Sequence, residues 1–132
     1  MPDSTQKKIL CIDDDRFLLD MYALKFSKAN YQVKTCDSTL AALKMIKEEG
    51  YTPDVITCDI VMPGMDGLSL VEVIRKENLI PKAVIIMLTN QGSPDDIARA
   101  KKLTVDGYIV KATAIPSEVL AEVQKIVARK NI

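Results

Sequence analysis

The 132-residue chain contains no histidine. This absence excludes Ser-His-Asp and Cys-His nucleophilic schemes and every metal site built on imidazole ligands. The three cysteines, Cys11, Cys36 and Cys58, are odd in number and form no C-x-x-C pair. Neither a disulfide framework nor a zinc site is therefore indicated, and we expect free thiols in a reducing compartment.

The sequence also lacks a surplus of charge of either sign, with 18 Lys plus Arg and 18 Asp plus Glu. A nucleic-acid or anionic-membrane partner would favour a basic surplus. No apolar signal-peptide core begins the chain, and no apolar run is long enough to span a bilayer. We therefore expect a cytoplasmic protein that contacts no membrane and no nucleic acid directly.

The chain has the length of one domain, which we place at residues 1–132 with a core at residues 8–128. Short apolar runs predict strands at residues 7–12, 31–36, 55–58, 82–88 and 106–110. Helical periodicity predicts helices at residues 16–30, 38–50, 67–78 and 93–103 and a last one from residue 116. Strict alternation of strands and helices favours a parallel sheet with helices on both faces.

Two helices show their expected inner faces by spacing. Phe17, Met21 and Leu24 fall at i, i+4 and i+7 of the first helix, with Leu18 and Tyr22 beside them. Leu40, Leu43 and Ile46 mark one face of the second helix, which Ser38 is expected to cap. Ser93 and Pro94 predict the start of the fourth helix in the same way.

Four predicted strands end in a polar residue where the apolar run stops. These residues are Asp13 and Asp14, then Asp59, Thr89 and Lys111. Because the carboxyl ends of parallel strands share one edge of a sheet, we expect these side chains to form one pocket. Crowded carboxylates repel, so either their pKa values rise or a cation lies among them. Oxygen ligands of this kind suit Mg²⁺, and a carboxylate beside Mg²⁺ can attack a phosphoryl group.

Each residue also has a simpler interpretation. Residues 13–15 could cap the first helix, and Asp59 could be a turn residue. Thr89 could merely end a strand, Lys111 could be a solvated surface lysine, and Tyr108 could be a half-buried strand aromatic. The coincidence of four strand ends with compatible chemistry favours a functional site over these separate interpretations.

The motifs at these strand ends resemble the receiver domain of two-component response regulators, of the chemotaxis-regulator type. They are Ile12-Asp13-Asp14, the run from Asp59 to Gly67 (DIVMPGMDG), Leu88-Thr89, and the run from Gly107 to Lys111 (GYIVK). The resemblance covers residues 8–128. It implies an α/β fold, namely a single doubly wound (βα)5 flavodoxin-like domain with a five-stranded parallel sheet in the order 2-1-3-4-5.

The resemblance also implies roles for individual residues. Asp59 would be the phosphoacceptor, with Thr89 and Lys111 contacting the phosphoryl oxygens. Asp14, Asp59 and the backbone carbonyl of Val61 would hold Mg²⁺ directly, and Asp13 would act largely through water. Thr89 and Tyr108 would form the switch that responds to phosphorylation.

The implied function is a phosphoacceptor switch of a two-component system or phosphorelay. The phosphodonor would be a phosphohistidine of a sensor histidine kinase or histidine phosphotransfer protein, and the downstream effector stays unnamed. Phosphorylation of Asp59 would change the face formed by the fourth helix, fifth strand and fifth helix, which is also the expected homodimer surface. Such a domain is not an enzyme beyond autocatalytic phosphorylation and dephosphorylation.

Two departures from the family pattern concern the loops of the site. Asn90 follows Thr89 where a small residue is usual, so it could narrow access to the phosphoryl group or hydrogen-bond to it. Ala112 follows Lys111 where a proline in a cis peptide is usual. A cis bond before a non-proline residue costs about 2.5–4 kcal/mol, so we expect a trans or a strained loop there.

Two other functions stay open from the residues. One is a receiver-like docking module that is never phosphorylated, against which the complete acid set argues. The other is a phosphatase of the haloacid-dehalogenase kind, which uses a D-x-D motif ending in Thr or Val. The segment from Asp13 to Phe17 has the acid spacing, but Phe17 stands at the final position.

Overall fold

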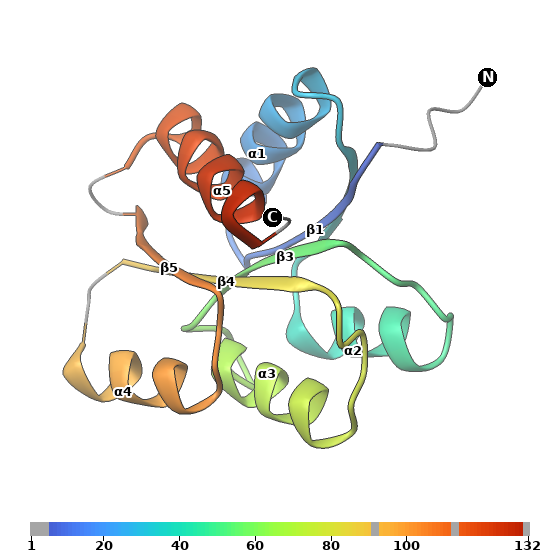
Figure 1. The fold of residues 1–132 in the computed structure, drawn as a ribbon, viewed down its shortest axis with the longest axis vertical. Coiled ribbons are helices and arrows are strands. Elements are labelled where there is room, and N and C mark those ends of the chain that lie inside the picture. The colour runs from blue at the N-terminus through green and yellow to red at the C-terminus, as the bar shows by residue number, and fades with distance from the viewer. Residues whose placement is uncertain (1–5, 91–92, 112–113, 131–132) are drawn as a thin grey trace.

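The computed structural model describes residues 6–90, 93–111 and 114–130, in which strands and helices alternate strictly (Figure 1). The elements are β1 (Lys8–Ile12), α1 (Arg16–Lys28), β2 (Gln32–Cys36), α2 (Thr39–Lys47), β3 (Val55–Asp59), α3 (Gly67–Lys76), β4 (Val84–Thr89), α4 (Pro94–Lys102), β5 (Gly107–Val110) and α5 (Pro116–Lys130). The predicted order of elements is confirmed, with boundaries that differ by a few residues.

The strands form one parallel sheet in the order β2-β1-β3-β4-β5, which confirms the predicted topology. Ile12 pairs with Cys58 across β1 and β3, and Asp59 pairs with Leu88 across β3 and β4. The residues that follow β1 therefore emerge next to the end of β3. This adjacency, made by the crossover in strand order, gathers the acidic residues at one edge.

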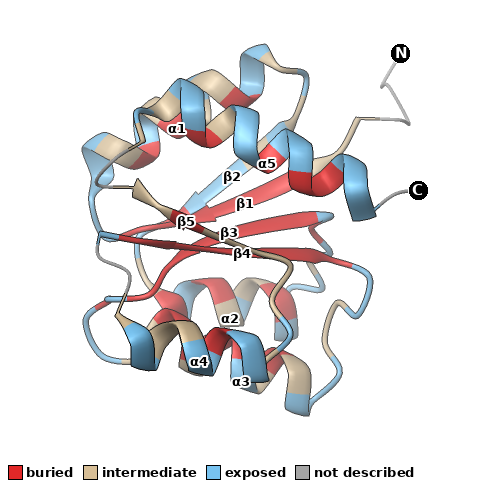
Figure 2. Cartoon of the chain, turned by 60° about the vertical axis from the view of Figure 1, so that its left-hand side comes forward, coloured by how far each residue is buried: buried red, intermediate tan, exposed pale blue. Residues whose placement is uncertain are grey.

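The sheet separates two helical layers. Helices α1 and α5 cover one face, and α2, α3 and α4 cover the other (Figure 1). Every residue of β3 and β4 is buried, whereas β2 at the sheet margin is mostly exposed (Figure 2). Strands covered on both faces need apolar side chains on both faces, which explains the unbroken apolar run of β4. None of the helices in the described ranges has the length and hydropathy that crossing a bilayer requires.

Short polar side chains start four of the helices. Asp15, Ser38, Asp66 and Ser93 are the N-caps of α1, α2, α3 and α4, and each accepts a hydrogen bond from a backbone N–H of the first turn. The caps predicted at Ser38 and Ser93 are confirmed. Such caps satisfy amides that have no partner inside the helix. The caps of α1 and α3 also fix the loops that follow β1 and β3.

The inner face predicted for α1 was right at Tyr22 and Leu18, which lie in or against the core, but wrong at Phe17 and Leu24. Phe17 is 74% exposed and Leu24 is 57% exposed, whereas Leu19, Tyr22 and Phe26 are buried. Helix α1 carries two apolar stripes, and periodicity does not say which stripe faces the sheet. The stripe that faces the sheet is the one with two aromatic side chains, Tyr22 and Phe26, because burying more apolar area is more favourable.

The face predicted for α2 was wrong at its first position. Leu40 is 62% exposed, while Ile46 is buried together with Thr39 and Ala42. A threonine can replace a leucine in the interior only if its hydroxyl finds a partner. Thr39 has such a partner, since its Oγ1 donates a 2.6 Å hydrogen bond to the carbonyl of Met65.

Candidate functional site

The predicted site residues gather at the carboxyl edge of the sheet. Asp13 directly follows β1, Asp59 ends β3, Thr89 ends β4 and Lys111 directly follows β5. Asp13, Asp59 and Thr89 are buried. Four segments that are far apart in the sequence thus contribute one polar group each to a common place.

Lys111 is the positive centre of this cluster. Its Nζ lies 2.8 Å from Oδ2 of Asp13 and 2.9 Å from Oδ2 of Asp59. The Lys111 side chain is only 7% exposed, so both contacts are shielded from water. Shielded, charge-assisted hydrogen bonds are short and strong, which excludes the interpretation of Lys111 as a solvated surface lysine.

A third carboxylate leaves the cluster with an excess of negative charge. Oxygen atoms of Asp13, Asp14 and Asp59 lie within 4.8 Å of one another, and Asp14 is exposed. One ammonium faces three carboxylates, so a divalent cation would relieve the remaining repulsion. Hard oxygen donors that converge this closely fit Mg²⁺.

The charges in this cluster shift one another's pKa. Burial raises the pKa of Asp59, and the hydrogen bond from Lys111 opposes that rise without cancelling it. Burial alone would lower the pKa of Lys111, but its bonds to Asp13 and Asp59 outweigh burial and raise it. Lys111 is therefore held as an ammonium, while the carboxylate form of Asp59 is disfavoured relative to water.

Asp13 and Asp15, two of the three consecutive acids after β1, make different contacts. Oδ1 of Asp13 accepts a 2.9 Å hydrogen bond from the backbone amide of Asp15, while its Oδ2 accepts one from the Lys111 ammonium. Asp15 accepts the amide of Leu18 at 3.1 Å and so caps α1. The capping interpretation thus holds for Asp15, and the turn it forms directs Asp13 inward.

Helix α3 packs directly on the backbone of Asp59. The amide of Gly67 donates a 2.8 Å hydrogen bond to the carbonyl of Ile60. A Cβ at Gly67 would clash with the carbonyl oxygen of Asp59. Glycine is required there by this close approach, which explains the last residue of the DIVMPGMDG motif.

Tyr108, Val61 and Asn90 surround the cluster. Tyr108 on β5 is half-buried, and its hydroxyl lies within reach of the Thr89 side chain. Burial raises the pKa of Tyr108, and the Thr89 side chain opposes that rise. The Val61 side chain is 69% exposed and Asn90 is exposed. Ala112 lies outside the described residues, so the expectation for its loop stays a prediction.

Two contacts at this edge had no signal in the sequence. Thr39 binds the carbonyl of Met65, and Arg99 binds the Asp66 carboxylate at 3.1 Å. Met65 and Asp66 belong to the loop that follows Asp59. A capping pattern could indicate Asp66, but nothing in the spacing links it to a residue of α4.

The sequence profile of the family described as "Response regulator receiver domain" matches residues 9–124. The chain is 33% identical over 127 residues to "Probable transcriptional regulator ycf27" of Guillardia theta, covering 96% of this chain and 48% of the relative. It is 32% identical over 126 residues to the alkaline phosphatase synthesis transcriptional regulatory protein PhoP of Bacillus subtilis, covering 96% and 50%. The solved structure of chemotaxis protein CheY4 of Vibrio cholerae matches with a TM-score of 0.82 and 29% identity, covering 92% of this chain and 99% of that one.

The chain therefore belongs to the response regulator receiver domains, the signalling modules of two-component systems. Receiver domains are signalling switches and generally not enzymes, they bind Mg²⁺ at an acidic pocket, and they interact with histidine kinases and effector domains. The chain spans about half the length of the curated relatives named above. Neither the docking-module function nor the phosphatase function finds support in these matches.

Proposed function

We propose that Asp59 is the phosphoacceptor of a phosphorylation switch. A carboxylate oxygen of Asp59 attacks the phosphorus of a partner phosphohistidine, the new P–O bond forms, and the P–N bond breaks so that the imidazole leaves. The observation that carries this proposal is the placement of Asp59 at a strand end, 2.9 Å from the Lys111 ammonium. The partner is a sensor histidine kinase or a histidine phosphotransfer protein.

The residues around Asp59 support the transfer. Lys111 stays close to the acceptor oxygen and stabilises the negative charge of the phosphoryl group. The Thr89 hydroxyl at the end of the neighbouring strand donates to a phosphoryl oxygen. Asp14, Asp59 and the Val61 carbonyl would hold Mg²⁺ directly and Asp13 would act largely through water, and the ion would supply positive charge against the phosphoryl oxygens.

The response to phosphorylation involves Thr89 and Tyr108. Their strand positions adjoin, because Thr89 pairs with Val110 and Met87 pairs with Tyr108 across β4 and β5. Added charge on Asp59 draws Thr89 toward it, and Tyr108 repacks in the space vacated. The face of α4, β5 and α5 then changes its affinity for an effector or for a second copy of the chain.

Further properties belong to the same proposal. Residues 1–132 form one receiver domain that contacts neither nucleic acid nor a membrane directly, and its only chemistry is autocatalytic phosphorylation and dephosphorylation. The two relatives named above are described as transcriptional regulators and are about twice as long as this chain, so this proposal concerns the receiver domain alone. The free, buried cysteines support a cytoplasmic location.

Intact mass after incubation with acetyl phosphate and Mg²⁺ tests the acceptor. We expect one added phosphoryl group on the wild type and none on Asp59→Asn. Addition to both proteins would assign the phosphoryl group to another residue. No addition to the wild type, from acetyl phosphate or from a phosphohistidine protein, would overturn the proposal.

Thermal unfolding with Mg²⁺ tests the metal site. A cation that binds only the folded protein stabilises it by about 2.7 kcal/mol at a concentration 100 times Kd. We expect Mg²⁺ to raise the Tm of the wild type and to raise that of Asp14→Asn much less. Asp14 is exposed, so this substitution removes a ligand without disturbing the core. An equal rise in both proteins would exclude Asp14 as a ligand.

A further inference from the structure

The loop of residues 60–66 joins the acceptor strand to α3. Its ends are pinned by the hydrogen bond from the Gly67 amide to the Ile60 carbonyl. The chain reverses at Gly64, whose φ is +74°. Val61 lies in this loop, so the position of its carbonyl depends on how the rest of the loop is held. The following inference rests on the proposed function, in which that carbonyl is a Mg²⁺ ligand.

Thr39 holds the far side of this loop. It is the first residue of α2 and is 1% exposed. Its Oγ1 donates a 2.6 Å hydrogen bond to the carbonyl of Met65. A buried hydroxyl has no water to replace this acceptor, so the bond fixes the loop relative to α2.

Arg99 of α4 binds Asp66, the residue that follows Met65. Its Nη1 lies 3.1 Å from Oδ2 of Asp66, and its Nη2 lies 3.5 Å from Oγ of Ser69. Oδ1 of Asp66 accepts the amide of Ser69 at 2.7 Å. Burial would raise the pKa of Asp66, but the bonds from Ser69 and Arg99 outweigh burial and lower it.

The two contacts come from helices on either side of α3. Figure 1 shows α3 between α2 and α4 on the same face of the sheet. Thr39 from α2 and Arg99 from α4 therefore brace consecutive residues, Met65 and Asp66, from two sides. Each helix contributes one side chain to a loop that neither helix adjoins in the sequence.

We propose that Thr39 is a positioning residue for the phosphoacceptor site, which holds the loop of residues 60–66 through the Met65 carbonyl while Arg99 braces Asp66. Metal-ligating groups need to be held within about 0.5 Å of their productive geometry. The bond from Thr39 joins two groups of the protein itself and needs no ion, so we expect it to restrain the loop that carries the Val61 carbonyl whether or not Mg²⁺ is bound. Arg99 is the weaker brace, because its side chain is 44% exposed.

The experiment compares Thr39→Val, which keeps the shape but lacks the hydroxyl, with Thr39→Ser, which keeps the hydroxyl. We expect the Mg²⁺ affinity of Thr39→Val, measured by calorimetry, to fall roughly tenfold, as when an outer-shell partner of a metal ligand is lost. Thr39→Ser should stay within about twofold of the wild type. The phosphorylation rate with acetyl phosphate should fall at low Mg²⁺ and recover at saturating Mg²⁺.

A matched control separates positioning from general loss of packing. Thr57 is also a 1% exposed threonine, and its side chain hydrogen-bonds Cys11 within the sheet rather than the loop. Thr57→Val should leave Mg²⁺ affinity unchanged. Hydrogen exchange of the Gly67 amide, which bonds the Ile60 carbonyl at the base of the loop, should accelerate without metal in Thr39→Val and stay at the wild-type rate in Thr57→Val.

Two results would overturn the proposal. One is wild-type Mg²⁺ affinity and wild-type exchange of the Gly67 amide in Thr39→Val, and the other is equal weakening in Thr39→Val and Thr57→Val. If Thr39→Val does not fold, Arg99→Gln takes its place, and unchanged exchange of the Gly67 amide in that variant counts against the brace. A wild type that accepts no phosphoryl group would refute the proposed function instead, and the exchange measurement would still decide whether Thr39 holds the loop.

Discussion

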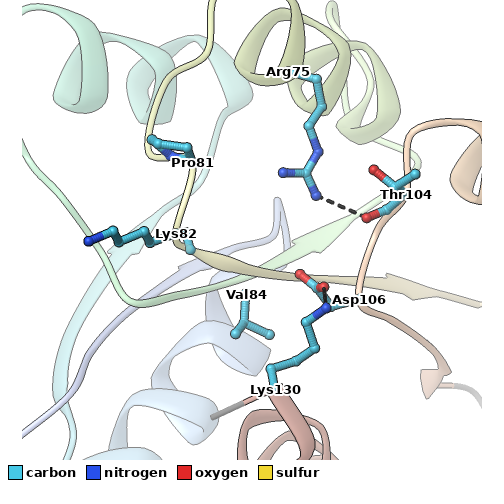
Figure 3. A pocket seen from close by; sticks show the side chains of 8 residues that line it. Arg75, Pro81, Lys82, Val84, Thr104, Asp106 and Lys130 are labelled. Carbon is cyan, nitrogen blue, oxygen red and sulfur yellow. Dashed lines mark hydrogen bonds and ion pairs between the residues drawn. The ribbon is translucent and has the colours of Figure 1, made fainter. Parts of the chain in front are cut away.

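The amino ends of the strands (the amino edge) and their carboxyl ends (the carboxyl edge) differ in how their charged side chains are paired. At the amino edge, Arg75, Asp106 and Lys130 line a cavity of about 320 Å³ (Figure 3). Asp106 binds Lys130 at 3.0 Å and the amide of Ile85 at 2.8 Å, and Arg75 donates to the carbonyls of Leu103 and Thr104. At the carboxyl edge, the Lys111 ammonium binds Asp13 and Asp59, and the nearby Asp14 carboxylate adds a third negative charge.

The difference shows which charges stabilise the fold and which serve chemistry. Each charged group named at the amino edge has a partner: Arg75 bonds two carbonyls just after α4, and Asp106 bonds Lys130 of α5 and an amide of β4. Satisfied groups of this kind contribute to folding. The acids at the carboxyl edge are crowded beyond what Lys111 can neutralise, so they cost stability. Crowding of this kind is typical of functional sites, which agrees with the proposed roles of these acids in holding Mg²⁺ and accepting a phosphoryl group.

The largest effect should come from removing the lysine at each edge in turn. Lys111→Met leaves Asp13 and Asp59 buried without their cation, and breaking such a buried pair costs about 3–5 kcal/mol. Lys130→Met removes a lysine whose side chain is 54% exposed, so it should cost at most about 1 kcal/mol. Urea unfolding without Mg²⁺ measures both. Similar losses in the two variants would refute the contrast between the edges.

An intermediate effect should come from neutralising Asp59, the proposed phosphoacceptor. Burial raises the pKa of Asp59 above its ordinary value of 3.8. Its contribution to stability is therefore fully present below pH 3.8 and is lost as the pH rises through the raised value. Asp59→Asn should match the wild type in acid and exceed it by about 1 kcal/mol at neutral pH, within the range of stabilising substitutions.

The measurement is urea unfolding across this pH range in metal-free buffer. Asp106→Asn is the control. Asp106 is paired with Lys130 and the Ile85 amide, so neutralising it should lower the stability of the protein. A neutral-pH loss of stability in Asp59→Asn would show that Lys111 fully compensates the acceptor carboxylate.

The smallest effect concerns backbone strain at the amino edge. Four helices are followed, two or three residues after their last residue, by a residue with positive φ, and these residues are Asn30, Gly50, Asn78 and Thr104. Glycine and asparagine adopt this conformation at little cost, whereas a β-branched residue does not. Thr104→Gly should therefore stabilise the protein by about 0.5–1 kcal/mol, after the greater freedom of glycine in the unfolded chain is subtracted.

Thermal unfolding of Thr104→Gly checks this expectation. Arg75 binds the backbone carbonyl of Thr104, so the substitution keeps that contact. Asn78→Gly is the matched control at the end of α3 and should change stability by less. A loss of stability in Thr104→Gly would show that the bond from its hydroxyl to the Leu103 carbonyl outweighs the strain.

Local residue patterns determine the order of the strands and helices in this protein. Apolar runs of β length, the serine caps at Ser38 and Ser93, and strict alternation were sufficient for the order of elements. Each of these signals acts within a few residues. The site followed from the same local rule, because strand ends of a parallel sheet must share an edge.

Only the tertiary structure decided which faces and which distant partners meet. Helix α1 could bury either Phe17 or Phe26, and its packing on the sheet selected Phe26. The bonds from Thr39 to Met65 and from Arg99 to Asp66 join segments 26 and 33 residues apart. Periodicity describes one element at a time, whereas these choices depend on the shape and the unpaired polar groups of the neighbouring element.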